Sequence, residues 1–185
     1  MRIYPKRLLL VLFLAMCGNA HAVTAGDQAP AWAGNDLRDG TQVSFPEVLD
    51  GRPAVLLFWA TWCPYCKAFM PYAKQIHADY AESGLQVLTF NTKERGRGDP
   101  KAYMASLDFP VVAIADADGI AQQYDVQFIP GLMVVDGSGQ VVYRRASTNL
   151  PAGSTVAQQW SNEVRAAVEK LLAVTPSAPV LGSGR

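Results

Sequence analysis

The sequence predicts an α/β protein in which helices flank a mixed β-sheet. Three observations lead to this prediction. The apolar run AVLLFWA at 54–60 has the length of a strand and no polar face, as in a strand that is covered on both sides. Strand-like and helix-like segments alternate after it, which is typical of layered α/β folds. Two β-rich runs within 131–145 are joined by Asp-Gly-Ser-Gly, which indicates an antiparallel hairpin and makes the sheet mixed.

The N-terminal segment is typical of an export signal. It begins with three basic residues, Arg2, Lys6 and Arg7. The apolar stretch LLLVLFLAMCG at 8–18 follows, and it is too short to span a bilayer comfortably. The tripeptide AHA at 20–22 offers small residues at both positions that signal peptidase reads. We therefore expect residues 1–22 to be a cleaved signal peptide, with an uncleaved membrane anchor as the alternative.

Cleavage at this point would change the charge and the cysteine count. Removal of three basic residues leaves 13 Lys and Arg against 16 Asp and Glu, a formal charge of −3. That charge gives no electrostatic footprint for nucleic acid. Cys17 follows Met16, which makes a poor lipid-attachment motif, so we interpret Cys17 as an apolar residue of the removed segment. The remaining two cysteines would enter a compartment where disulfides persist.

The elements of the expected domain, residues 23–174, follow in chain order. Residues 26–53 are rich in Gly, Pro and Asp, and they predict a hairpin around Asp39-Gly40 and a turn of helix at 46–50. Further strands are expected at 85–91 and 110–116, and helices at 64–82, 101–108, 119–126 and 155–173. A polar loop over 93–100 contains the basic cluster of Lys93, Arg95 and Arg97, which we expect to be solvated, with docking of an acidic partner as the alternative. Residues 175–185 are expected to form a disordered tail.

Two of these helices show a clear apolar face. The first is expected to end at Gly84, and its apolar residues recur at spacings of four, three and four: Phe69, Ala73, Ile76 and Tyr80. The last one carries its apolar residues on one side: Val156, Trp160, Val164, Ala167 or Val168, and Leu171.

The motif CPYC carries the chemistry of this sequence. Cys63 stands where the strand gives way to the helix, and Pro64 suits the first helical position. Cys66 is one turn further, within reach of a disulfide. The helix N-terminus favours the thiolate of Cys63, which we expect to be exposed and to attack other disulfides. The sheltered Cys66 would then attack the mixed disulfide and release the partner.

Two other interpretations of the cysteine pair are weaker. A structural disulfide that closes so short a loop removes little chain entropy. A metal site needs further ligands, and His77, the only histidine after the signal segment, lies about 16 Å further along a straight helix. The spacing therefore favours a redox dithiol, with no metal or cofactor.

At this point the sequence resembles the thioredoxin superfamily. FWATWC and CPYCK match the strand, aromatic lead-in and dithiol of that family, and Pro71 stands where its members kink the helix. FIPG at 128–131 stands where they carry a cis-proline that faces the dithiol. The resemblance implies a thioredoxin fold with a cis Ile129-Pro130 bond, and a groove shaped by Trp62, Pro64, Tyr65, Ile129 and Pro130 that binds substrate peptide.

The opening of the domain narrows this resemblance. GDQAPAW, LRDGTQVSF and LDGRPAVLLFWATWCPYC are similar to the exported TlpA/ResA-like proteins, with their N-terminal extension and central insertion. This similarity implies a periplasmic reductase of exported protein disulfides that receives electrons from a membrane donor. A disulfide oxidase or isomerase of the same fold stays open. Two other classes are a thiol peroxidase, for which Leu56 and Ala60 replace the expected Pro and Thr, and a copper-binding protein of this fold.

One departure from the family concerns a proton-relay carboxylate. Plain thioredoxins carry an aspartate where this chain has Leu57, and TlpA/ResA-like proteins often carry a glutamate where it has Phe69. Such a group moves protons to and from the buried thiol. Glu94 and Asp125 are the candidates to replace it.

Overall fold

A computed structural model describes residues 22–96, 98–146 and 155–174. The predicted signal peptide, apart from its last residue, and the predicted tail over 175–185 lie outside these residues. No helix in the described ranges is long and apolar enough to cross a membrane.

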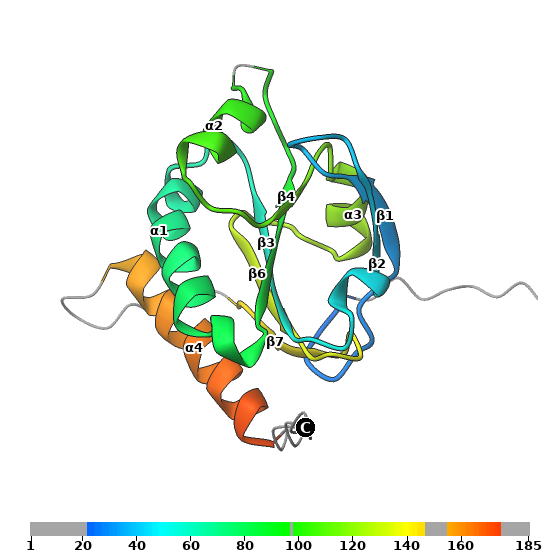
Figure 1. The fold of residues 1–185 in the computed structure, drawn as a ribbon. Coiled ribbons are helices and arrows are strands. Elements are labelled where there is room, and N and C mark those ends of the chain that lie inside the picture. The colour runs from blue at the N-terminus through cyan, green and yellow to red at the C-terminus, as the bar shows by residue number, and fades with distance from the viewer. Residues whose placement is uncertain (1–21, 97, 147–154, 175–185) are drawn as a thin grey trace, which may run out of the picture.

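Five strands form the central sheet in the order β5-β4-β3-β6-β7 (Figure 1). These strands are β3 (Ala54–Trp59), β4 (Gln86–Asn91), β5 (Val112–Ile114), β6 (Gly131–Val135) and β7 (Val141–Arg144). The pairs β3-β4 and β4-β5 are parallel, whereas β3-β6 and β6-β7 are antiparallel. The predicted mixed sheet and its closing hairpin are therefore confirmed.

Helices cover both faces of this sheet. One face carries α1 (Pro64–Asp79), α4 (Val156–Val174) and the short α2 (Pro100–Ser106), as Figure 1 shows. The opposite face carries α3 (Asp118–Gln123) together with the hairpin of β1 (Trp32–Asn35) and β2 (Gln42–Phe45). This hairpin and the single helical turn η1 (Glu47–Leu49) precede β3, and α2 with β5 lies between β4 and α3, where the sequence predicts an N-terminal extension and a central insertion.

The side chains of β3 explain why its sequence is apolar throughout. Val55, Leu57 and Trp59 point into the cluster under α1 and α4, because successive residues of a strand face opposite sides. Leu56 and Phe58 point into the cluster under α3 and the β1-β2 hairpin. All five are at most 1% exposed, so neither face of this strand tolerates a polar residue.

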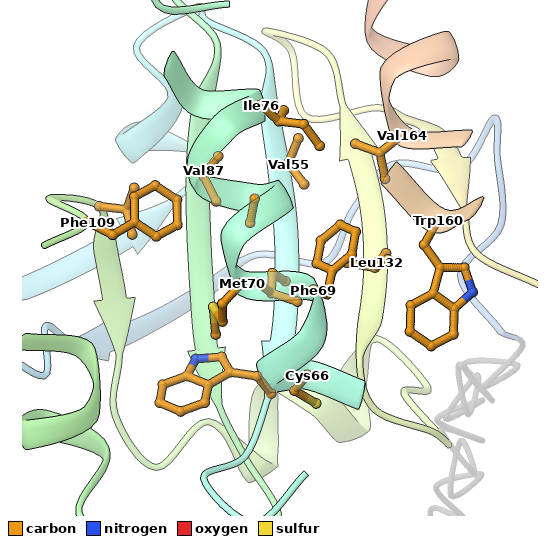
Figure 2. Close-up of a cluster of buried hydrophobic side chains, with 14 of the residues drawn as sticks. Val55, Cys66, Phe69, Met70, Ile76, Val87, Phe109, Leu132, Trp160 and Val164 are labelled. Carbon is orange, nitrogen blue, oxygen red and sulfur yellow. The ribbon is translucent and has the colours of Figure 1, made fainter. Parts of the chain in front are cut away.

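The predicted apolar face of α1 is also confirmed. Phe69 and Ile76 of α1 are fully buried against the sheet and α4. Trp160 and Val164 of α4 belong to the same cluster, as Figure 2 shows. The helix ends earlier than the predicted residue 82, and one further turn, η2 (Ala81–Ser83), follows it. Gly84 closes that turn with a φ of 77°, a left-handed conformation that glycine adopts without a steric penalty.

Candidate functional site

The two cysteines occupy the first turn of α1, as the sequence predicts. Cys63 is the N-cap residue and Pro64 follows it at the first helical position. The Cα atoms of Cys63 and Cys66 are 5.3 Å apart and the two residues form a disulfide. The backbone N–H of Cys66 donates a hydrogen bond to Cys63 Sγ over 3.1 Å. This N–H belongs to the first turn, where the helix backbone offers it no acceptor, and in the reduced protein it would stabilise a thiolate on this sulfur.

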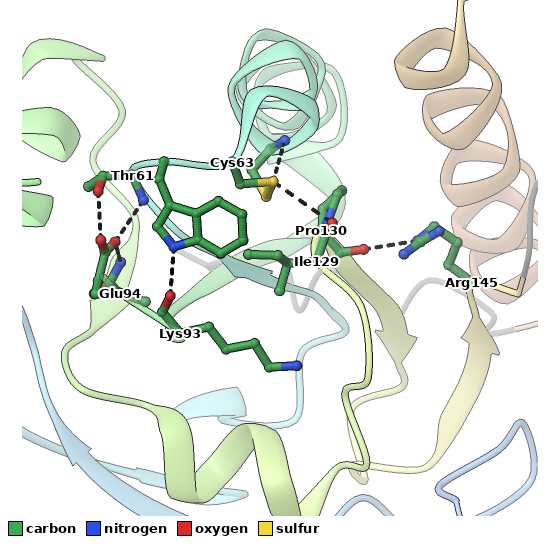
Figure 3. The surroundings of a disulfide bond; sticks show 10 residues. Thr61, Cys63, Lys93, Glu94, Ile129, Pro130 and Arg145 are labelled. Carbon is green, nitrogen blue, oxygen red and sulfur yellow. Dashed lines mark hydrogen bonds between the residues drawn. A yellow bond between two sulfur atoms is a disulfide. The ribbon is translucent and has the colours of Figure 1, made fainter. Parts of the chain in front are cut away.

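The expected exposure of Cys63 is wrong for this oxidised state. Cys63 is only 2% exposed, against 0% for Cys66. The reason is the loop before β6, because the carbonyl oxygen of Ile129 lies 3.8 Å from Cys63 Sγ (Figure 3). Sequence spacing identifies the first cysteine of the helix but not the chain that packs over it.

The loop opposite the dithiol is held by a basic side chain. The Ile129-Pro130 peptide bond is cis, as the resemblance implies. Arg145 Nε donates to the carbonyl oxygen of Pro130 over 2.9 Å, and its guanidinium lies 4.7 Å from the ring centroid of Trp160. Burial lowers the pKa of Arg145 from its ordinary value, against the attraction of Tyr143 and Glu163.

Three exposed aromatic side chains belong to the segment around the dithiol motif and to the loop before β6. Trp62 is 36% exposed, Tyr65 57% and Phe128 80%. Among the described residues, the only other large hydrophobic side chain with comparable exposure is Val174, at the end of α4. Exposed aromatic side chains are typical of surfaces that bind protein. Phe128 was not among the predicted site residues, although its position directly before Ile129 in the sequence could have indicated it.

Trp62 is fixed from two sides. Its Nε1 donates to the carbonyl oxygen of Lys93 over 2.6 Å. The guanidinium of Arg95 stacks on its ring, 3.5 Å from the centroid. The loop that follows β4 therefore holds the residue next to Cys63. No local pattern indicates this contact, because Trp62 and Lys93 are 31 positions apart along the chain.

Glu94 is hydrogen-bonded to Thr61, two residues before the first cysteine. It accepts hydrogen bonds from Thr61 N over 2.7 Å, from Thr61 Oγ1 over 2.6 Å and from Asn91 Nδ2 over 2.7 Å (Figure 3). Asp125, the other predicted candidate, instead accepts a hydrogen bond from Gln127. Glu94 thus fixes the backbone two residues before Cys63.

A cleft of about 630 Å³ opens beside these residues. Its walls include Thr61, Trp62 and Glu94, with Lys67 and Tyr103 from α1 and α2. Within the part of the chain that the structure describes, no group of three or more His, Cys, Asp or Glu side chains is arranged to hold a metal ion.

The structure brings all seven predicted site residues to one place. Trp62, Pro64 and Tyr65 surround Cys63 on the α1 side, and Ile129 and Pro130 face it from the loop before β6. Such a site, a sulfur pair between an exposed aromatic rim and an irregular loop, is suited to exchange with a thiol or disulfide on another protein.

Comparisons with known proteins agree with this geometry. Residues 24–159 match the protein family described as Redoxin. A thiol-disulfide oxidoreductase ResA of Geobacillus thermodenitrificans (strain NG80-2) is 29% identical over 155 residues, which cover 76% of this chain and 84% of that protein. A second ResA, of Geobacillus kaustophilus (strain HTA426), is 28% identical over the same shares.

Solved structures share the fold. A protein of Geobacillus kaustophilus superposes with a TM-score of 0.71 at 23% identity, covering 85% of this chain and 86% of that one. A putative thiol:disulfide interchange protein DsbE of Chlorobium tepidum gives a TM-score of 0.68 at 21% identity, covering 82% and 99%.

Proposed function

The chain belongs to the Redoxin family as a TlpA/ResA-like thiol-disulfide oxidoreductase of the thioredoxin superfamily, and from this premise we propose that it reduces disulfides in exported proteins. The observation that carries the proposal is the Cys63–Cys66 disulfide at the N-terminus of α1, with the Cys66 N–H directed at Cys63 Sγ. In the reduced protein this N–H and the helix dipole favour a thiolate on Cys63.

The reaction has two steps. In the first step the Cys63 thiolate attacks one sulfur of the substrate disulfide. A bond from Cys63 to the substrate forms, the substrate disulfide breaks, and its other sulfur leaves as a thiolate that takes up a proton from solvent. In the second step Cys66 loses its proton to solvent and attacks Cys63 Sγ, which forms the Cys63–Cys66 disulfide and releases the second substrate sulfur as a thiolate that is protonated in turn. Two electrons pass from the protein dithiol to the substrate, and a separate dithiol donor must restore them.

The surroundings of the dithiol support a polypeptide substrate. Trp62, Pro64 and Tyr65 would contact the substrate on one side of Cys63, and Ile129 and Pro130 would offer backbone groups on the other. In this proposal the substrates are exported proteins with thiols or disulfides, and a membrane thiol-disulfide protein is the donor.

The location of the protein is part of the same proposal. A cleaved signal peptide over residues 1–22 would export a single thioredoxin-like domain, residues 23–174, to the periplasm. A chain carrying an epitope tag at its C-terminus tests this, because export predicts a shortened product in the periplasmic fraction. Full-length protein in the cytoplasm would contradict it.

Single cysteine variants test the chemistry. The substrate is a peptide with one internal disulfide, and dithiothreitol is the electron donor. With this donor, Cys63→Ser is expected to abolish enzyme-dependent reduction. Pre-reduced Cys66→Ser, mixed with the peptide after dithiothreitol has been removed, is expected to accumulate a mixed disulfide, visible as a mass increase that later addition of dithiothreitol reverses. Full turnover by either variant would contradict the roles given to the two residues.

A further inference from the structure

The wall of the site that faces the dithiol is an irregular segment. Residues 126–130, here named the facing loop, lie between α3 and β6 in neither helix nor strand. Ile129 O, next to Cys63 Sγ, and the exposed ring of Phe128 both belong to this loop. Val126 N donates to Ala121 O over 2.8 Å at the start of the loop, and side chains that bond to the carbonyl groups of the loop add to this anchor.

Lys93 is one of the residues that hold the facing loop. Its ammonium donates to Val126 O over 2.7 Å and to Gln127 O over 2.9 Å. Its backbone carbonyl accepts the hydrogen bond of Trp62 Nε1 over 2.6 Å. One residue therefore contacts both walls of the site, the aromatic lead-in to Cys63 and the loop on the other side.

The backbone of Lys93 is held in an uncommon conformation. Its φ is 57°, a left-handed conformation that residues with a Cβ adopt rarely and glycine adopts without a steric penalty. Asp118 Oδ1 fixes this conformation by accepting hydrogen bonds from Lys93 N and Thr92 Oγ1, over 2.8 and 2.9 Å. A glycine would relieve the backbone but would lose both bonds to the facing loop.

Two arginines support the same region from the β7 side. Arg144 donates to the carbonyl oxygens of Tyr124 and Asp125, and Arg145 donates to that of Pro130. Neither side chain has a hydrogen bond to Trp62 in the described residues. Lys93 differs from them because it also sets where the facing loop stands relative to Trp62.

We propose that Lys93 is a positioning residue that fixes the distance between Trp62 and the facing loop, so that a polypeptide disulfide which contacts both walls is held against Cys63. This inference rests on the proposed function. A peptide that touches both Trp62 and Phe128 reacts fastest when these walls are already in place, because orientation then costs no further entropy. A small disulfide reaches Cys63 without spanning the walls and does not need Lys93.

The test compares two substrates, a peptide with one internal disulfide and the small neutral hydroxyethyl disulfide. Lys93→Met removes the ammonium while keeping the length of the side chain. It is expected to lower kcat/KM for the peptide about ten-fold, mainly through KM, and to change the value for hydroxyethyl disulfide less than about two-fold. Lys93→Arg keeps donors at this position, and we expect it to recover most of the peptide activity.

Two further variants serve as controls. Lys74 on α1 also donates to a loop carbonyl, Leu107 O over 3.0 Å, outside the site, so Lys74→Met is expected to match the wild type on both substrates. Lys93→Gly relieves the left-handed backbone while removing the ammonium. It is therefore expected to fold even if Lys93→Met does not, and to show the same selective loss.

Three results would overturn the inference: an unchanged kcat/KM for the peptide in the Lys93 variants, equal losses on both substrates, or no recovery in Lys93→Arg. The wild type separates these results from a failure of the proposed function. If the wild type reduces neither disulfide, the function itself is wrong and the role of Lys93 falls with it.

Discussion

Removal of the Glu94 carboxylate is expected to destabilise the protein more than the loss of a half-buried side chain usually does. Glu94 accepts three hydrogen bonds, two from Thr61 and one from Asn91, and both partners are buried. A hydrogen bond to a charged group contributes about 1.5–3 kcal/mol when buried, and we use about 1 kcal/mol each because solvent reaches Glu94. Glu94→Ala should therefore lower the free energy of unfolding by about 3 kcal/mol.

Glu94→Gln should have a smaller effect. Its amide oxygen can still accept from Thr61 N and Asn91 Nδ2, so the loss is expected to be about 1 kcal/mol. Urea denaturation followed by tryptophan fluorescence measures both values. With a denaturant slope of about 2 kcal/mol/M, the midpoint of Glu94→Ala would fall by roughly 1.5 M. Glu82→Ala removes an exposed carboxylate and serves as the control.

A double-mutant cycle identifies the partner. Thr61→Val removes the hydroxyl donor of one bond and leaves the backbone donor in place. The destabilisation caused by Glu94→Ala should be about 1 kcal/mol smaller in the Thr61→Val background. The reasoning would be refuted if Glu94→Ala destabilised the protein no more than Glu82→Ala, or if the two changes were additive.

Three further predictions concern stability. Burial raises the pKa of Asp36, but the hydrogen bonds and charge of Arg38 lower it more, so its pKa lies below the ordinary 3.8. The interaction of the Asp36 carboxylate with Arg38 therefore stabilises the fold above pH 4, and this stabilisation is lost in stronger acid. Asp36→Asn should lower the free energy of unfolding by about 1–2 kcal/mol at pH 7 and by less at pH 3. An equal cost at both pH values would contradict this. Gly98→Ala would place a Cβ against the Thr61 hydroxyl, 2.5 Å from Thr61 Cβ. This clash should lower the free energy of unfolding, measured by urea denaturation, by about 1–3 kcal/mol. A stability equal to the wild type would show that the loop at residue 98 shifts without cost. Phe69→Ala empties a fully buried site and should cost about 3–5 kcal/mol by the same measurement, whereas a loss below 1 kcal/mol would mean that the core under α1 collapses around the gap.

The parts of the fold that were predicted are those with local signals. The apolar run at 54–60 has no polar face because β3 is buried on both sides. Pro64 after Cys63 marks the start of α1, and the glycines around 136–139 mark the closing hairpin. Each of these features depends on residues that are close together in the sequence, so patterns in the sequence could reveal them.

The parts of the site that were missed depend on contacts between distant residues. The bonds of Glu94 to Thr61, and of Lys93 to Val126 and Gln127, join residues more than 30 positions apart. A polar loop with basic residues is typical of a solvated segment, which is the interpretation that the sequence favoured for Lys93. Only the path of the chain after β4 shows that this ammonium is bonded to carbonyl groups instead.

The burial of Cys63 has the same origin. Its place at the N-cap follows from the sequence, whereas its cover comes from the carbonyl of Ile129 in the facing loop. Resemblance to a family identified that loop through Pro130, but not the distance between the loop and the sulfur. The exposure of Cys63 depends on parts of the chain that are distant in the sequence, so the local spacing of the cysteines could not predict it.

The most direct test of the proposed direction of electron flow is the reduction potential of the Cys63–Cys66 couple. It can be measured by equilibrating the purified domain in thiol-disulfide buffers and determining the fraction of free cysteine. A reductase of exported proteins predicts a potential near or below that of thioredoxin, about −270 mV. A value approaching that of DsbA, about −120 mV, would contradict the reductase and indicate an oxidase or isomerase.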